Sequence, residues 1–273
     1  ALESGKHVMC EKPMAKTAAD ARLMLETAKK TGKKLTIGYQ NRFRPDSLLM
    51  KRAAEEGELG DIYFAKAHAI RRRAVPTWGV FLNEYEQGGG PLIDIGTHAL
   101  DLTLWMMDNY KPKAVLGRAF KKLGDQKESG NAWGDWDPKE FTVEDSAFGM
   151  VTMENGAAII LESSWAINLL DVREAQTTLC GTMGGADMID GLRFNRIHLG
   201  RQVVEQVDLN AGGVAFYDGA SAADPAELEC SQWITSILND TNPLVLPEQA
   251  LVVTEILEAI YTSSKTGKAV YFD

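Results

Sequence analysis

The first 45 residues contain two short apolar runs and, between them, a stretch with apolar residues at helical spacing. Residues 7–10 and 34–38 are short apolar runs, which is typical of buried strands. Residues 18–30 place alanine and leucine at helical spacing among charged residues, and Thr17 stands where it can cap the helix. A strand, a helix and a strand in this order predict one unit of a parallel α/β sheet.

A different pattern begins after residue 45. A helix is predicted over 46–56 and a long alternating strand over 62–72. Further strands are predicted at 114–121, 146–153, 157–165, 174–180, 186–190, 197–199 with 203–207, and 269–272. Two helices, 225–238 and 247–263, each begin with a proline, which suits the first helical turn. Together these elements predict a large, mostly antiparallel open β-sheet with helices on one face.

The change of pattern predicts an α/β plus α+β protein with one domain over residues 1–44 and a second over 45–273. Net charge is -9, which argues against nucleic-acid binding. The three cysteines, Cys10, Cys180 and Cys230, lie far apart, so we expect neither disulfides nor a metal site. Apolar runs are too short to span a bilayer. We therefore expect a cytoplasmic protein with no membrane or nucleic-acid partner.

The stretch 88–101 carries the clearest candidate chemistry. Three glycines and a proline precede an apolar run that holds Asp94, His98 and Asp101 at positions i, i+4 and i+7. A helix through this run would place all three side chains on one face. A histidine between two carboxylates has a tunable pKa and suits proton transfer. The alternative interpretation is an ordinary amphipathic helix with a polar face.

Two motifs in order resemble the Gfo/Idh/MocA family of nicotinamide-dependent oxidoreductases. Glu11-Lys12-Pro13 follows a strand, and the run Gly-Gly-Gly-Pro-Leu-Ile-Asp-Ile-Gly-Thr-His ends at His98. The segment 181–186 is similar to a glycine-containing turn of the same family. The resemblance implies that residues 1–44 are the C-terminal part of a dinucleotide-binding Rossmann domain. It also implies that residues 45–273 form the substrate-binding, catalytic and oligomerisation domain.

The resemblance implies an NAD(P)-dependent dehydrogenase that transfers a hydride between nicotinamide and a sugar, polyol or cyclitol hydroxyl carbon. Lys12, Asp94 and His98 are then the catalytic residues, and either Lys12 or His98 takes the proton. Glu11, Lys12, Pro13 and Gln40 are expected near the cofactor, with Pro13 shaping the turn as a cis bond. Asp101 could orient the imidazole of His98, but a simple surface carboxylate is the favoured expectation.

Substrate contacts are predicted from position and side-chain type. Asn41 and Arg42 follow a strand end, where ligands gather in open α/β sheets. Arg73, Trp78 and Trp165 are candidates for lining a sugar site, because aromatic faces pack well on pyranose rings. No metal ligand set is expected.

The family's G-x-G-x-x-G fingerprint, which binds the pyrophosphate, is absent from the 273 residues. We therefore expect a chain that lacks the front of its nucleotide domain, binds NAD or NADP weakly and is inactive alone. Two alternatives remain open: a glycoside hydrolase that uses NAD for transient oxidation and elimination, and a non-catalytic sugar-sensing regulator. The uncovered face of the sheet predicts a homodimer or homotetramer.

Overall fold

The N-terminal part of the chain is a parallel two-stranded sheet joined by a helix. The computed structural model describes residues 1–127, 130–209 and 224–272. After a short 3-10 turn (Leu2–Ser4), β1 (Val8–Cys10) and β2 (Leu35–Ile37) pair in parallel, connected by α1 (Ala18–Thr31). The Thr17 side chain accepts a hydrogen bond from the backbone N–H of Asp20 and caps α1, and Gly32 in the left-handed conformation ends it. The predicted strand–helix–strand unit is confirmed.

The rest of the chain is built on a nine-stranded sheet with the order β10-β9-β8-β7-β3-β6-β5-β4-β11. Among the described strands of this large sheet, β3–β6 is the only pair that is parallel. The strands are β3 (Ile62–Ile70), β4 (Pro112–Phe120), β5 (Ser146–Met153), β6 (Ala158–Ser164), β7 (Glu174–Gly181), β8 (Gly184–Asp187), β9 (Arg193–His198), β10 (Arg201–Gln206) and β11 (Val270–Tyr271). A small parallel sheet beside a large, mostly antiparallel one confirms the predicted fold class.

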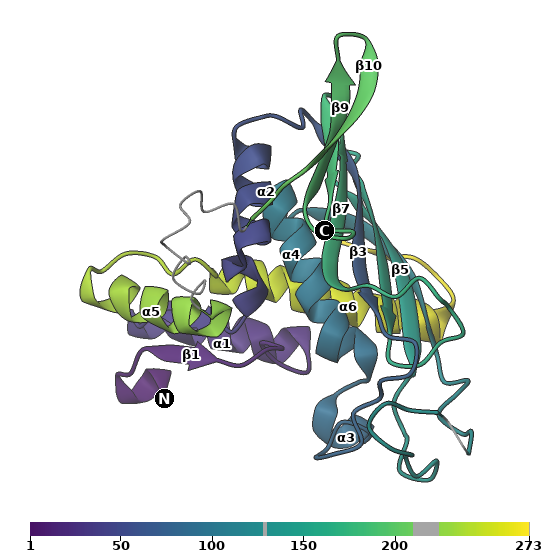
Figure 1. The fold of residues 1–273 in the computed structure, drawn as a ribbon. Coiled ribbons are helices and arrows are strands. Elements are labelled where there is room, and N and C mark those ends of the chain that lie inside the picture. The colour runs from purple at the N-terminus through teal and green to yellow at the C-terminus, as the bar shows by residue number, and fades with distance from the viewer. Residues whose placement is uncertain (128–129, 210–223, 273) are drawn as a thin grey trace, which may run out of the picture.

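Helices cover one face of this sheet (Figure 1). The helical elements after β2 are a 3-10 turn (Gln40–Phe43), α2 (Pro45–Glu55), α3 (Glu84–Gln87), a π-helical turn (Leu92–Gly96), α4 (Thr97–Met107), α5 (Pro225–Leu238) and α6 (Pro247–Thr266). α4 packs on β3 and β7, and α6 packs on β4. A Cβ at Gly117 or Gly149 would lie 2.7 or 2.6 Å from the Ile260 side chain, so α6 sits directly on the strands.

The β9–β10 hairpin differs from the expectation and projects from the end of the sheet (Figure 1). The strand predicted over 197–199 instead runs over Arg193–His198, and its partner begins at Arg201. Leu199 and Gly200 form the turn, with φ angles of 47° and 73°. Leu199 is 91% exposed, so its apolar side chain, which suggested a buried strand, marks a turn.

The last two helices return to the N-terminal unit. α6 packs against α1, and Arg22 forms an ion pair with Glu255 at 2.6 Å. The backbone N–H of Ala18 donates to Glu258 at 3.1 Å. No helix of the described residues is long and apolar enough to cross a membrane.

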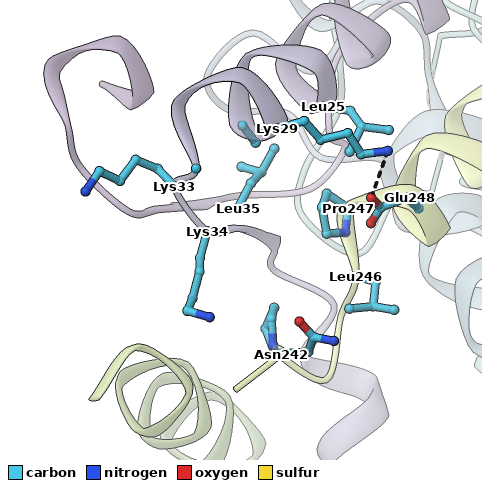
Figure 2. A pocket seen from close by; sticks show the side chains of 12 residues that line it. Leu25, Lys29, Lys33, Lys34, Leu35, Asn242, Leu246, Pro247 and Glu248 are labelled. Atoms are coloured by element: carbon cyan, nitrogen blue, oxygen red, sulfur yellow. Dashed lines mark ion pairs between the residues drawn. The ribbon is translucent and has the colours of Figure 1, made fainter. Parts of the chain in front are cut away.

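A hollow of about 230 Å³ lies where α1, β2 and the segment leading into α6 meet (Figure 2). Lys29 reaches across it to pair with Glu248 at 3.1 Å, and Lys33, Lys34 and Asn242 lie along its edge. None of the residues predicted to bind substrate or cofactor lines this hollow. Two of the predicted catalytic residues, Lys12 and Asp94, instead meet at the carboxyl end of β1.

Candidate active site

The three glycines before Asp94 leave room for neighbouring groups. A Cβ at Gly89 would lie 2.1 Å from the hydroxyl oxygen of Tyr261, and one at Gly90 would lie 2.2 Å from the carbonyl oxygen of Glu144. Real Cβ atoms cannot approach so closely, because both distances are far inside van der Waals contact. The glycines therefore let this segment lie directly against α6 and the start of β5.

Glu144 fixes the end of this glycine segment. Its buried carboxylate accepts hydrogen bonds from the backbone N–H of Gly90 at 2.8 Å and of Leu92 at 3.1 Å. The Tyr261 hydroxyl donates to the same carboxylate at 2.8 Å. Burial raises the pKa of Glu144, and these hydrogen bonds oppose that effect. Three hydrogen bonds to the Glu144 carboxylate thus fix the start of the turn that carries Asp94.

Asp94 lies in a π-helical turn, Leu92–Gly96, rather than in the regular helix expected from its spacing. Such turns insert one residue into the helical path and are frequent at functional sites. α4 begins at Thr97 and carries His98 and Asp101, all three of them buried. The sequence placed a helix here correctly but gave no sign of the wider turn.

Lys12 and Asp94 form the centre of the site. The Lys12 ammonium donates to Oδ1 of Asp94 at 2.7 Å and to its backbone oxygen at 2.9 Å. Oδ2 of Asp94 accepts a hydrogen bond from the indole N–H of Trp165 at 3.1 Å. The Lys12–Pro13 peptide bond is cis, as expected. Residues that are 82 positions apart in the sequence therefore meet at one carboxylate.

His98 is buried beside this pair and uncharged. Burial, followed by the positive charge of Lys12, lowers the pKa of His98 to about 3, and the Asp94 carboxylate only partly opposes them. The edge of the imidazole meets Tyr39, with ring centroids 6.1 Å apart. Nδ1 of His98 is buried, and no hydrogen-bond partner for it is found among the described residues. An uncharged imidazole is a proton acceptor near neutral pH.

Arg42 and Asp101 form a separate, fully buried ion pair. Two nitrogens of Arg42 donate to the two oxygens of Asp101, at 2.9 and 2.6 Å. Arg42 is 0% exposed and Asp101 is 1% exposed, and the guanidinium also lies 5.4 Å from the centre of the Trp105 ring. The expectation of a surface carboxylate at Asp101 is wrong, because its charge is matched in the interior by Arg42. The Arg42 guanidinium is fully buried with this partner, so no surface of it is open to a substrate.

Of the three residues predicted to line a sugar site, Trp165 and Arg73 have structural partners and Trp78 is exposed. Trp165 is 0% exposed and holds Asp94 instead of lining an open surface. The Arg73 guanidinium donates to the backbone oxygen of Ile167 and to Oδ1 of Asn168, at 2.8 and 2.7 Å, and so joins two loops. Trp78 is 53% exposed and remains available for a ligand.

The carboxyl ends of β1 and β2 are where ligands bind in open α/β sheets. Glu11 is exposed there, and Gln40 and Asn41 are half-buried in the 3-10 turn after β2. A Cβ at Gly38 would lie 3.3 Å from Oε2 of Glu11, so the glycine leaves this carboxylate room between the strands. A carboxylate and the Lys12 ammonium fit the hydroxyls and amide of a nicotinamide riboside. These residues therefore fit the nicotinamide end of NAD.

The sequence analysis did not single out Arg71, Trp133 or Glu229 as site residues. Arg71 forms an ion pair with Glu174, and its charge helps to lower the pKa of His98. The Arg71 guanidinium lies 5.3 Å from the centre of the Trp133 ring. Glu229 of α5 is 7% exposed, and burial, then the Glu11 charge, raises its pKa to about 7. No local pattern could reveal them, because each is positioned by a distant segment.

Comparison with known proteins gives two matching family models. Residues 1–39 match the oxidoreductase family with an NAD-binding Rossmann fold, and residues 47–187 match the GFO/IDH/MocA C-terminal domain. D-glucoside 3-dehydrogenase of Escherichia coli K12 is 36% identical over 271 residues, which cover 99% of this chain and 74% of that protein.

Solved structures share the fold at lower identity. An oxidoreductase domain protein from Kribbella flavida matches with a TM-score of 0.84 and 22% identity over 100% of this chain and 76% of that one. Levoglucosan dehydrogenase in complex with NADH and levoglucosan matches with a TM-score of 0.81 and 19% identity, over 99% and 74% of the two chains.

Proposed function

The chain belongs to the GFO/IDH/MocA family of NAD-binding oxidoreductases, and from this premise we propose that it oxidises a hydroxyl group of a sugar or glycoside. The observation that carries the proposal is the cluster of Lys12, Asp94 and His98. An ammonium, a carboxylate and an uncharged imidazole lie together at the carboxyl end of β1. The similarity to a D-glucoside 3-dehydrogenase over 99% of the chain supports a glucoside as substrate.

Oxidation of a secondary alcohol removes a hydride from carbon and a proton from oxygen. NAD, when bound, supplies the hydride acceptor. Lys12 has three N–H donors and uses two of them on Asp94, so the third can donate to the substrate oxygen. A cation at this position stabilises the negative charge that develops on that oxygen.

His98 is assigned as the proton acceptor. Its imidazole is uncharged near neutral pH, because burial and the Lys12 charge lower its pKa to about 3. An imidazole with so low a pKa is a weak base, so proton uptake depends on the Asp94 charge, which raises this pKa. Asp94 stabilises the imidazolium that forms when the proton arrives, and Trp165 holds Asp94 in place. Lys12 thus polarises the hydroxyl, and His98 takes its proton.

The outer face of the large sheet is proposed to join two or four copies of the chain. Leu116, Met150 and Val204 point to the face opposite α4 and α6, and they are 55%, 44% and 69% exposed. Exposed apolar side chains on one sheet face mark an interface. Light scattering should therefore give a dimer or tetramer, and a Leu116→Glu/Met150→Glu variant should shift it toward monomer. A wild-type monomer would contradict the proposal.

A polypeptide limited to these 273 residues is proposed to bind NAD weakly. Its sequence contains no G-x-G-x-x-G after a strand, so the pyrophosphate has no glycine-rich turn to bind. Calorimetry on this polypeptide should show weak binding, and a dissociation constant in the low micromolar range would contradict the expectation. Activity is therefore measured on the natural gene product in which these 273 residues occur.

The test of the proposed function is NADH formation from a panel of glucosides and polyols. His98→Asn should lower turnover by about 10²–10⁴-fold, because it removes the proton acceptor. His68→Asn is the matched control, since His68 is also buried but is bonded to Glu162 and Thr178 on the other face of the sheet. NADH formation from none of the compounds would refute the proposal. Aglycone release without NADH accumulation would favour the glycosidase alternative, and sugar binding without turnover would favour the sensor.

A further inference from the structure

We propose that Trp78 and Trp133 form a second binding surface, next to the reacting sugar, that recognises the ring of a glycoside's aglycone. The aglycone is the group attached to the sugar, and the ligand in question is a ring with a flat apolar face. The inference rests on the proposed function, because it takes the reacting sugar to lie at Lys12, Asp94 and His98. Trp78 is already a candidate for lining the sugar site; the new elements are Trp133 and the contact with the aglycone, which neither the sequence motifs nor the comparisons assign.

A series of aromatic rings leads from Asp94 to the protein surface. Trp165, which binds Asp94, meets Phe81 with ring centroids 6.2 Å apart. Phe81 meets Trp78 at 6.0 Å, and Trp78 meets Trp133 at 5.1 Å, each pair in an edge-to-face arrangement. The innermost ring, Trp165, is 0% exposed, whereas the outer two, Trp78 and Trp133, are 53% and 45% exposed. The outer two rings are therefore continuous with the reacting site and open to solvent.

Hydrogen bonds between side chains and backbone hold together the two loops that carry these tryptophans. The Thr77 hydroxyl donates to the backbone oxygen of Trp133 at 3.0 Å. Asn131 accepts from the backbone N–H of Val75 at 2.8 Å and donates to its backbone oxygen at 2.9 Å. The indole rings take no part in these bonds. The surface is thus positioned in advance, and its rings are left for a ligand.

Arg71 fixes this surface relative to the reacting groups. Its guanidinium lies 5.3 Å from the centre of the Trp133 ring and pairs with Glu174. The same guanidinium is close enough to His98 to affect the imidazole electrostatically. Arg71 thus contacts the Trp133 ring, and its positive charge also contributes to the lowered pKa of His98.

The geometry fits one flat ring. Trp78 and Trp133 meet at an interplanar angle of 73°, so the two indoles form a corner. A ring seated in this corner would contact one indole through its face and the other through its edge, the arrangements that aromatic groups prefer. Binding sites for small molecules combine such apolar walls with a few polar groups that fix orientation. The polar groups are at Lys12 and Asp94, and the apolar wall is the corner.

The experiment compares three glucosides that share the reacting sugar. Methyl β-glucoside has no aglycone ring, phenyl β-glucoside has an aromatic ring, and cellobiose has a second sugar ring. Trp133→Ala and Trp78→Ala should raise KM for the two ring-bearing compounds by about tenfold, which is the value of one aromatic contact of about 1.4 kcal/mol. KM for methyl β-glucoside should stay within about twofold. A larger effect on phenyl glucoside than on cellobiose would identify an aromatic aglycone, and the reverse would identify a sugar.

Tyr63→Ala is the control variant. Tyr63 is 57% exposed and lies near the start of β3, whereas Arg71 follows the end of that strand. Its removal should change none of the three KM values. Equal increases for methyl and phenyl glucoside in the tryptophan variants would overturn the proposal, because both rings would then contact the reacting sugar itself.

Direct binding keeps the proposal separate from the proposed function. Titration of the protein with phenyl β-glucoside should quench tryptophan fluorescence, and Trp133→Ala with Trp78→Ala should weaken this binding by about tenfold. Wild-type protein that binds phenyl glucoside through these residues but forms no NADH would refute the dehydrogenase and leave the surface standing. Unchanged affinity in the double variant would refute the surface.

Discussion

The hydrogen bond from Trp165 to Asp94 offers a sharp test of how the site is held. Trp165→Phe keeps a buried aromatic ring but removes the indole N–H that donates to Oδ2 of Asp94 at 3.1 Å. Asp94 is 6% exposed, so water cannot readily replace the lost donor. A hydrogen bond to a charged group contributes about 1.5–3 kcal/mol. Since 1.4 kcal/mol is about tenfold, kcat/KM for methyl β-glucoside should fall by about 10–100-fold.

Trp136→Phe is the matched control for this change. Trp136 is 6% exposed, packs on Phe141, and donates its indole N–H to the backbone oxygen of Gly124 at 2.8 Å. Both variants therefore lose one buried indole hydrogen bond, but only Trp165→Phe touches Asp94. Thermal unfolding should show comparable losses of stability for the two. Activity should fall only in the Trp165 variant.

A double variant locates the effect. Once Asp94→Asn has removed the charge, Trp165→Phe should cost much less activity than it costs in the wild type, because the two residues act through one hydrogen bond. If Trp165→Phe and Trp136→Phe lose the same activity, or if the two changes at Asp94 and Trp165 are additive, then Trp165 does not position Asp94 and the reasoning is wrong.

Three further predictions concern stability. Asp101→Ala should lower the free energy of unfolding by about 3–5 kcal/mol in urea denaturation, because it leaves the buried Arg42 charge unpaired. The pKa of His98 falls from 6.5 to about 3 on folding, so below pH 6.5 the unfolded state binds a proton that the folded state does not. The folded state therefore loses stability as the pH falls below 6.5. Between pH 7 and pH 5, the free energy of unfolding in urea denaturation should fall by about 2 kcal/mol more for the wild type than for His98→Asn. Gly89→Ala should lower the melting temperature, since its Cβ would lie 2.1 Å from the Tyr261 hydroxyl oxygen, and adding Tyr261→Phe should restore part of the loss. Equal stability in any of these comparisons would contradict the corresponding contact.

Local patterns in the sequence predicted most of the secondary structure. The helix over 225–238 and the strand over 146–153 agree with α5 and β5 to the residue, because prolines and alternation mark their ends clearly. The turn at Leu199 was missed, since an apolar residue at a hairpin tip looks like part of a strand. Strand order could not be predicted, because β3 pairs with β6 and β7, which lie far along the chain.

The candidate site was predictable only where ordered motifs carried it. Lys12 and Asp94 were found because each stands in a recognisable run of residues, and the structure brings them to 2.7 Å. The structural role of Arg42 was missed, because its partner, Asp101, lies 59 positions away and nothing near either residue reveals the pair. Trp133 was missed for a similar reason, since it lies in a long polar loop and meets Trp78 only in the fold.

The contact between α1 and α6 also affects the order in which the protein can fold during synthesis. The unit that carries Lys12 leaves the ribosome before α6 does, so α1 finds this packing partner only when α6 has been made. Two of the contacts that join them, Arg22 to Glu255 and Ala18 to Glu258, span 233 and 240 positions. Contacts so far apart in sequence slow folding, because the chain between them must first be ordered. Until α6 has been made, the face of α1 that packs against it stays exposed. A nascent chain stalled before residue 247 should therefore depend on chaperones more than the finished protein does.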